Sequence, residues 1–84
     1  MYNVQISRRA EKQIKALPKT IKKRVSKKLI TLRQNPFSGD VKKLKVRHSR
    51  YRLRVGDYRI IFDIDKESIT ILVLTIRHCK DVYR

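Results

Sequence analysis

Cysteine is nearly absent from this chain, which has Cys79 and no other. A single cysteine cannot form an internal disulfide, and it excludes a zinc site built on several cysteines. Long apolar runs are missing as well: none approaches the ~18 residues that a membrane-spanning helix needs, and no signal-peptide pattern opens the chain. We therefore expect a cytoplasmic protein with no membrane partner.

Acidic side chains are also scarce. The 84 residues include 7 Asp and Glu against 23 Lys and Arg, which gives a formal charge of +16. The basic residues are spread along the chain without a basic tail, repeat or linker, so we expect one small domain over residues 1–84 with a thin core. Such a charge points to a partner of opposite sign: nucleic acid, an anionic membrane or an acidic protein.

Residues 50–64 predict a β-hairpin. Gly56 and Asp57 separate two runs of strand-forming residues, and a two-residue turn favours residues that tolerate a positive φ. If these two residues form the turn, Val55 faces Tyr58 and the remaining pairs follow in order. The side chains expected on the core face are Tyr51, Leu53, Val55, Tyr58, Ile60 and Phe62.

The other face of this hairpin collects arginines. Arg50 lies opposite a carboxylate at Asp63, but Arg54 lies opposite Arg59, and Arg52 falls on the same face. Like charges directly opposite on a sheet are unfavourable by roughly 0.2–1 kcal/mol. A fold gains nothing from the Arg54–Arg59 pair, whereas a polyanion bound to this face would.

The first third of the chain predicts a strand and two helices. Residues 2–6 alternate, which places Tyr2, Val4 and Ile6 inward, and Ser7 is a suitable N-cap for the helix that follows. The second helix is expected from Thr20 to about Gln34, where Asn-Pro ends it. The two short amphipathic helices are interpreted as a helical hairpin packed on a sheet.

The remaining segments complete an α+β fold. Residues 41–48 are expected to be a basic connector, residues 65–68 a turn, and residues 69–76 a last strand. In that register the side chains that share a face with Arg59 are Thr70, Leu72, Leu74 and Ile76, and His78 prolongs their row. The predicted fold is an N-terminal strand, a two-helix hairpin, and an antiparallel sheet of three C-terminal strands with the helices on one face.

The order of these elements, the run Tyr51-Arg-Leu-Arg-Val-Gly-Asp-Tyr-Arg59 and the closing Asp81-Val82-Tyr83 resemble the RelE/ParE toxin superfamily. The resemblance covers essentially the whole chain. It implies a toxin of a type II toxin–antitoxin pair that enters the ribosomal A site and cuts the messenger RNA there. It also implies a cognate RelB-like antitoxin, acidic or amphipathic, that covers the toxin surface.

The chemistry implied by the resemblance is attack of a ribose 2′-OH on the adjacent phosphate, with no metal and no cofactor. Arg52 and Arg54 then match residues that position the phosphate or take the proton, Arg59 matches the arginine that stabilises the phosphate charge, and Tyr83 matches an aromatic residue that orients the nucleotide. His78 is the best group for proton transfer, because histidine alone titrates naturally near neutral pH. The side chains expected to contact RNA around this site are Lys45, Arg77, Lys80, Lys22 and Lys23.

Two departures keep other readings open. Arginine stays protonated, so Arg54 is a poor general base, and Cys79 stands where related chains often have an arginine. The alternatives are a ParE-like inhibitor of DNA gyrase, or a relative without catalytic activity that binds RNA or its antitoxin. His78 could equally be an ordinary polar residue at a strand end, and Tyr83 could pack against the first helix.

Overall fold

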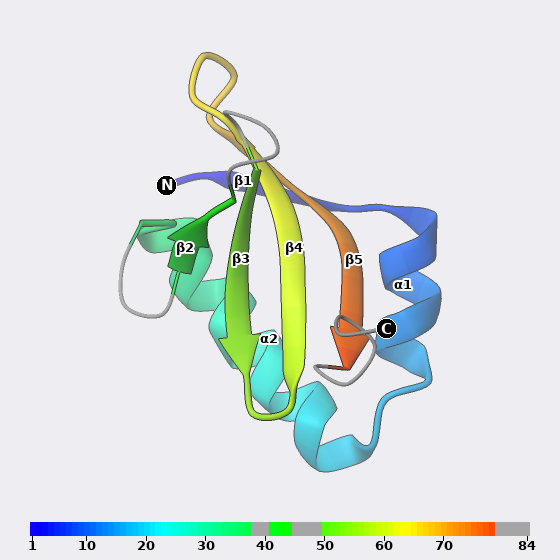
Figure 1. The fold of residues 1–84 in the computed structure, drawn as a ribbon. Coiled ribbons are helices and arrows are strands. Elements are labelled where there is room, and N and C mark those ends of the chain that lie inside the picture. Colours follow the sequence, from blue (N-terminus) through cyan, green and yellow to red (C-terminus); the bar gives the residue numbers. More distant parts are fainter. Residues whose placement is uncertain (38–40, 45–49, 79–84) are drawn as a thin grey trace.

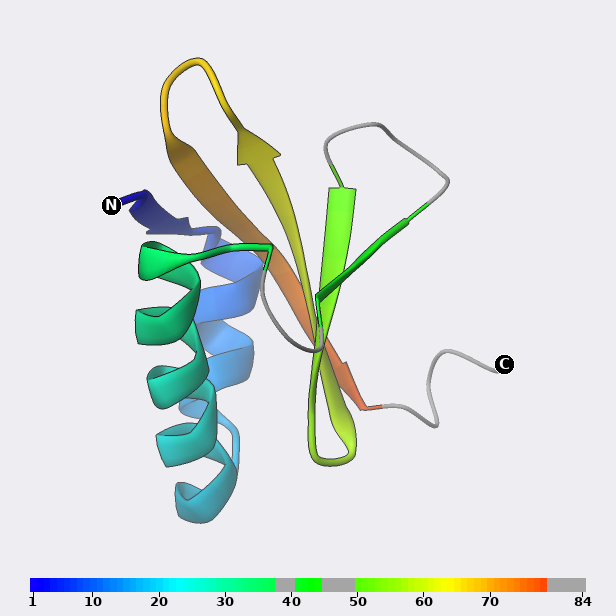
Figure 2. The ribbon, with the colours of Figure 1, turned by 90° about the vertical axis from the view of Figure 1, so that its left-hand side faces the viewer.

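The computed structural model describes residues 1–37, 41–44 and 50–78, which form one five-stranded sheet with two helices on one of its faces (Figures 1 and 2). The strand order is β1-β5-β4-β3-β2. The elements are β1 (Asn3–Ile6), α1 (Arg8–Lys15), α2 (Lys19–Gln34), β2 (Val41–Lys43), β3 (Arg50–Val55), β4 (Tyr58–Asp65) and β5 (Thr70–His78). The predicted α+β class, the helical hairpin and the three C-terminal antiparallel strands are confirmed.

The sheet is larger than predicted. β1 joins it in parallel with β5, and β2 pairs antiparallel with β3, so the sheet is mixed. The prediction of a connector over residues 41–48 is wrong for residues 41–43, because Val41 pairs with Leu53 and extends the core face of the sheet. Three residues are too few for an alternating pattern to reveal a strand.

The helices begin and end where local chemistry predicts. The Ser7 hydroxyl accepts a hydrogen bond from the Ala10 backbone N–H at 3.1 Å and caps α1. Asn35 caps the C-terminus of α2 with extended backbone, as expected before a proline. The inward placement of Ile6 is wrong: its side chain is 41% exposed, since it is the last residue of an edge strand.

The β3–β4 hairpin has the predicted register throughout, from the Val55–Tyr58 pair to the Arg50–Asp63 pair. Its core face packs against the helices, and Ile60 and Phe62 are fully buried. Gly56 has a φ of +58°, as a tight turn between these strands requires. The arginine face of the hairpin therefore points away from the helices.

The register of β5 changes along its length. Val73 pairs with Phe62 and Thr75 pairs with Ile61, so Leu74 is an extra residue in β5, a β-bulge. Beyond the bulge, Ile76 pairs with Ile60 and His78 with Tyr58. The prediction that Ile76 and His78 share a face with Arg59 is therefore wrong, because one inserted residue moves each later side chain to the opposite face.

Candidate nucleic-acid interface

Three arginines lie side by side across three neighbouring strands. Arg54 of β3 pairs with Arg59 of β4, and Arg59 pairs on its other side with Arg77 of β5. Directly opposite residues in antiparallel strands project from the same face, with Cβ atoms ~4.5–5.5 Å apart. We call Arg54, Arg59 and Arg77 the arginine row.

A second pair of like charges lies next to this row. Lys42 of β2 pairs with Arg52 of β3, two residues before Arg54. Two ion pairs occur among other described residues: Lys15 contacts Glu11 on α1, and Arg50 contacts Asp63 at the other end of the hairpin. The hydrogen bond from Arg50 to Asp63 raises the pKa of Arg50, so this arginine is engaged within the protein.

The sheet edge and α2 together form a depression of about 540 Å³, which we call the basic groove. It is lined by Arg24, Lys28, Lys42, Arg52, Arg54, Gly56, Asp57 and Arg59. Six of these eight residues have a cationic side chain and one has an acidic side chain. The groove thus continues from the arginine face of the sheet, past the β3–β4 turn, to Arg24 and Lys28 in the middle of α2.

Gly56 brings two of these arginines together. The Arg54 Nε donates a hydrogen bond to the Gly56 carbonyl oxygen at 3.0 Å. The Arg24 guanidinium lies over the same residue, with Nη1 2.9 Å from the position that a Cβ on Gly56 would take. The absence of a side chain at Gly56 is therefore what lets α2 place a guanidinium beside the sheet.

The structure brings some predicted site residues together and separates others. Arg52, Arg54 and Arg59 line the basic groove, and Arg77 extends the arginine row from β5. Lys22 and Lys23 do not line the groove, and the Lys22 Nζ donates instead to the Lys15 carbonyl oxygen at 3.3 Å. The predictions for Lys45, Lys80 and Tyr83 lie outside the described residues, as does Cys79.

Sequence reasoning missed Arg24, Lys28 and Lys42 as members of one groove. Arg24 and Lys28 are four residues apart, so they share one face of α2, and this spacing was the available signal. Lys19, Lys23 and Lys27 of α2 have the same spacing, so the pattern alone does not single out Arg24 and Lys28. Their place in the groove, and the contact of Arg24 with Gly56, become visible only in the folded structure.

His78 lies away from the arginine row. Its ring packs edge to face against Tyr58, with the ring centroids 5.0 Å apart, and the two residues are paired in the β4–β5 ladder. Tyr58 is on the core face of the hairpin, packed at the border of the hydrophobic core. Proton transfer by His78 stays a prediction, and the geometry associates its ring with Tyr58.

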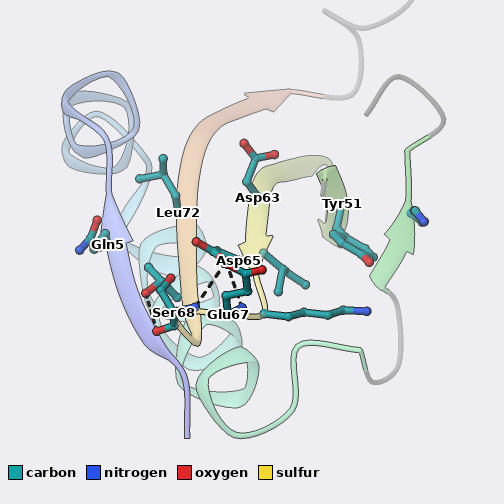
Figure 3. A pocket seen from close by; sticks show the side chains of 11 residues that line it. Gln5, Tyr51, Asp63, Asp65, Glu67, Ser68 and Leu72 are labelled. Carbon is teal, nitrogen blue, oxygen red and sulfur yellow. Dashed lines mark hydrogen bonds between the residues drawn. The ribbon is translucent and has the colours of Figure 1, made fainter. Parts of the chain in front are cut away.

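A second depression, of about 920 Å³, lies at the opposite end of the sheet around the β4–β5 turn (Figure 3). Its wall contains Asp63, Asp65 and Glu67 beside apolar Leu72. The Ser68 hydroxyl, with backbone N–H groups of Ser68 and Glu67, hydrogen-bonds the Asp65 carboxylate and lowers the pKa of Asp65. These carboxylates make it a poor place for phosphate.

The described part of the chain contains no group of three or more His, Cys, Asp or Glu side chains arranged to hold a metal ion. Neither of its helices has the length and apolar character needed to cross a membrane.

Several solved structures share this architecture. RelE in the archaeal RelE–RelB complex of Pyrococcus horikoshii superposes with a TM-score of 0.81 and 29% identity, covering 92% of this chain and 93% of that one. The RelE–RelB complex of Methanococcus jannaschii gives a TM-score of 0.77 at 30% identity, covering 94% of each chain. The isolated Escherichia coli RelE toxin has the same fold, with a TM-score of 0.83 at 20% identity and coverage of 100% and 98%.

Sequence comparison gives the family. Toxin RelE3 of Methanocaldococcus jannaschii is 38% identical over 77 residues, which are 86% of this chain and 84% of that protein. The family model described as "ParE toxin of type II toxin-antitoxin system, parDE" matches residues 4–83. The chain therefore belongs to this family and is a RelE-like toxin of a toxin–antitoxin system, which confirms the predicted RelE/ParE superfamily.

Proposed function

We propose that this toxin is a ribosome-dependent endoribonuclease that cuts messenger RNA in the A site. The observation that carries the proposal is the arginine row, in which Arg59 has an arginine as its direct neighbour on both sides. Like charges directly opposite on a sheet repel each other, and the negative charges of a bound chain of phosphates would offset this repulsion.

The proposed reaction is attack of a ribose 2′-OH on the neighbouring phosphate, which expels the 5′ oxygen of the next nucleotide. The phosphate gains negative charge as it becomes pentavalent, and guanidinium groups aimed at it stabilise this charge most where it is greatest. Arginine also offers a planar pair of N–H donors that matches two phosphate oxygens. Arg59, between Arg54 and Arg77, is the residue we assign to the scissile phosphate.

The basic groove supplies the surroundings of that phosphate. Lys42 and Arg52 lie along β2 and β3, and Arg24 and Lys28 form the wall on α2. We assign these side chains to neighbouring phosphates of the messenger or of ribosomal RNA. The net charge of +16 supports fast, salt-dependent association with so large a polyanion.

The proposed protein partner is a RelB-like antitoxin that covers the arginine face. Two of the solved structures that share this fold are RelE–RelB complexes at 29% and 30% identity to this chain. An acidic or amphipathic segment would complement the cationic surface of the toxin. Affinity purification of the toxin at low salt, from a strain that expresses the neighbouring reading frame, should recover this small partner.

The direct test is toeprinting of a translated message in a reconstituted system. The wild-type toxin should produce new 5′ ends in the A site, and Arg59→Ala should remove them. Lys27→Ala is the matched control, because Lys27 is an exposed cation of α2 that does not line the groove. A-site ends that persist unchanged in Arg59→Ala would defeat the assignment.

A ParE-like inhibitor of DNA gyrase is the second candidate, and the family model that matches residues 4–83 is the observation that favours it. Supercoiling and translation assays run on one preparation separate the two functions. Gyrase inhibition with intact translation would establish the second candidate, and cleaved messages with normal supercoiling would establish the first.

A further inference from the structure

Arg77 reaches the arginine row because of the bulge at Leu74. Upstream of the bulge, Leu72 pairs with Asp63 on the arginine face; downstream, Arg77 pairs with Arg59 on that face. These two residues are five positions apart, an odd number, so an unbroken strand would place them on opposite faces. Without the extra residue, Ile76 and His78 would occupy the arginine face and Arg77 would turn toward the helices.

The bulge forms where β5 loses its neighbouring strand. β1 pairs with β5 as far as Val73 and ends at Ile6, after which Ser7 and α1 lie along this edge. The Ser7 N–H donates to the Val73 carbonyl oxygen at 2.9 Å, and its hydroxyl donates to the Leu74 carbonyl oxygen at 2.7 Å. Side chains and the start of a helix thus replace β1 as the partner of β5.

Gln13 of α1 provides the next two hydrogen bonds along this edge of β5. Its Oε1 accepts a hydrogen bond from the Thr75 hydroxyl at 3.0 Å and another from the Ile76 backbone N–H at 2.7 Å. Thr75 and Ile76 are 9% and 4% exposed, so water does not readily replace this acceptor. A buried N–H or hydroxyl that loses its partner is costly, and Gln13 therefore favours the bulged register over an unbroken one.

We propose that Gln13 is a positioning residue of the RNA site: by accepting from both Thr75 and Ile76 it holds the bulge that places Arg77 beside Arg59. Gln13 itself touches neither RNA nor the reacting atoms and acts through Arg77. The inference rests on the proposed function in one respect, namely that the arginine row binds RNA phosphate.

The test is the affinity of the toxin for a short single-stranded 2′-O-methyl RNA, which cannot undergo 2′-OH attack, measured over a range of salt concentrations. Gln13→Leu should weaken binding toward the level of Arg77→Ala and lower the slope of log affinity against log salt by up to about one. In the Arg77→Ala background, Gln13→Leu should have no further effect. Independent, additive losses in the double variant would overturn the proposal.

Gln13→Glu is the rescue variant, because a carboxylate offers acceptors for both the Thr75 hydroxyl and the Ile76 N–H. It should bind RNA as well as Gln34→Glu, which makes the same charge change at the exposed end of α2. A Gln13→Glu protein that binds as weakly as Gln13→Leu would contradict the role of the two hydrogen bonds.

Further variants distinguish a loss of positioning by Gln13 from a general loss of stability and from an error in the proposed RNA site. Leu32→Val destabilises the core at the far end of α2 and should leave the affinity unchanged below its melting temperature. If Arg59→Ala and Arg77→Ala weaken binding but Gln13→Leu does not, the positioning role of Gln13 is rejected and the RNA site is retained. If neither arginine variant weakens binding, both the RNA site and the positioning role are rejected.

Discussion

Arg54 and Arg59 lie directly opposite each other on β3 and β4, and both remain on the face of the sheet that the helices leave open. The core does not need this pair, because Leu53, Val55 and Ile60 on the other face provide the packing. The RNA site proposed above would account for two like charges placed opposite each other on this face.

The Arg54→Gln variant should separate stability from activity. At low ionic strength, removing one charge from the pair should raise the free energy of unfolding by about 0.2–1 kcal/mol, and this gain should shrink as salt screens the repulsion. A-site cleavage should be lost. Urea titrations at low and high salt provide the measurement, with Lys27→Gln as the control for loss of one charge elsewhere; a stability loss at low salt would contradict the expectation.

Gly56→Ala should destabilise the toxin and disturb the basic groove. A φ of +58° costs a residue with a Cβ about 1–2 kcal/mol, and the added Cβ would also meet the Arg24 guanidinium. In an Arg24→Ala background the crowding disappears and the backbone cost remains, so Gly56→Ala should cost less there. Equal losses of unfolding free energy in both backgrounds would show that Arg24 does not press on this turn.

Arg24→Gln should weaken RNA binding and lower its salt dependence. If Arg24 contacts a phosphate, the slope of log affinity against log salt should fall by about one. Lys27→Gln removes the same charge from the same helix outside the groove and should change the slope less. Identical slopes for the two variants would mean that α2 contributes general charge and no defined contact.

The lowered pKa of Asp65 predicts that the free energy of unfolding depends on pH. Its pKa in the folded protein is lowered from the ordinary 3.8, so folding favours the carboxylate and the stabilisation is present above that value. The stabilisation is lost as the pH falls below 3.8 through the folded pKa. The difference in unfolding free energy between wild type and Asp65→Ala should therefore shrink from pH 6 toward pH 2, whereas that for Gln5→Ala, which does not titrate, should stay constant.

His78→Gln tests the proton-transfer prediction against the geometry. Because the His78 ring packs on Tyr58, we expect cleavage with an unchanged pH profile, together with a loss of stability of about 0.5–1.5 kcal/mol from the aromatic pair. Single-turnover cleavage on ribosomes between pH 5.5 and 8.5 measures the profile. Loss of a limb of the profile near neutral pH would instead identify His78 as a proton donor or acceptor.

Local patterns were sufficient for much of this fold. The turn at Gly56-Asp57 and strict alternation on either side predicted every pair from Arg50–Asp63 to Val55–Tyr58, because a two-residue turn and a buried face leave one register. Ser7 and Asn35-Pro36 predicted helix ends through backbone chemistry that acts within one turn.

Other features depend on contacts between distant parts of the chain. The site residues Arg24 and Lys28 become neighbours of Arg54 once α2 packs beneath the hairpin and its turn. β2 is too short to show a period, and its three residues form a strand because the edge of β3 is available to them. Neither fact is contained in a window of neighbouring residues.

By itself, the sequence determined the charge of this toxin, its helices, and a hairpin with arginines opposed on one face, since these follow from composition, turn chemistry and a period of two. The tertiary structure decided on which face of the sheet the side chains of β5 lie beyond the bulge. The hydrogen bonds that Ser7 and Gln13 make with residues 73–76 span more than sixty positions. They favour a bulge that places Arg77, and not His78, in the arginine row. A change of register held by such long-range bonds leaves no local signal in the residues that it moves.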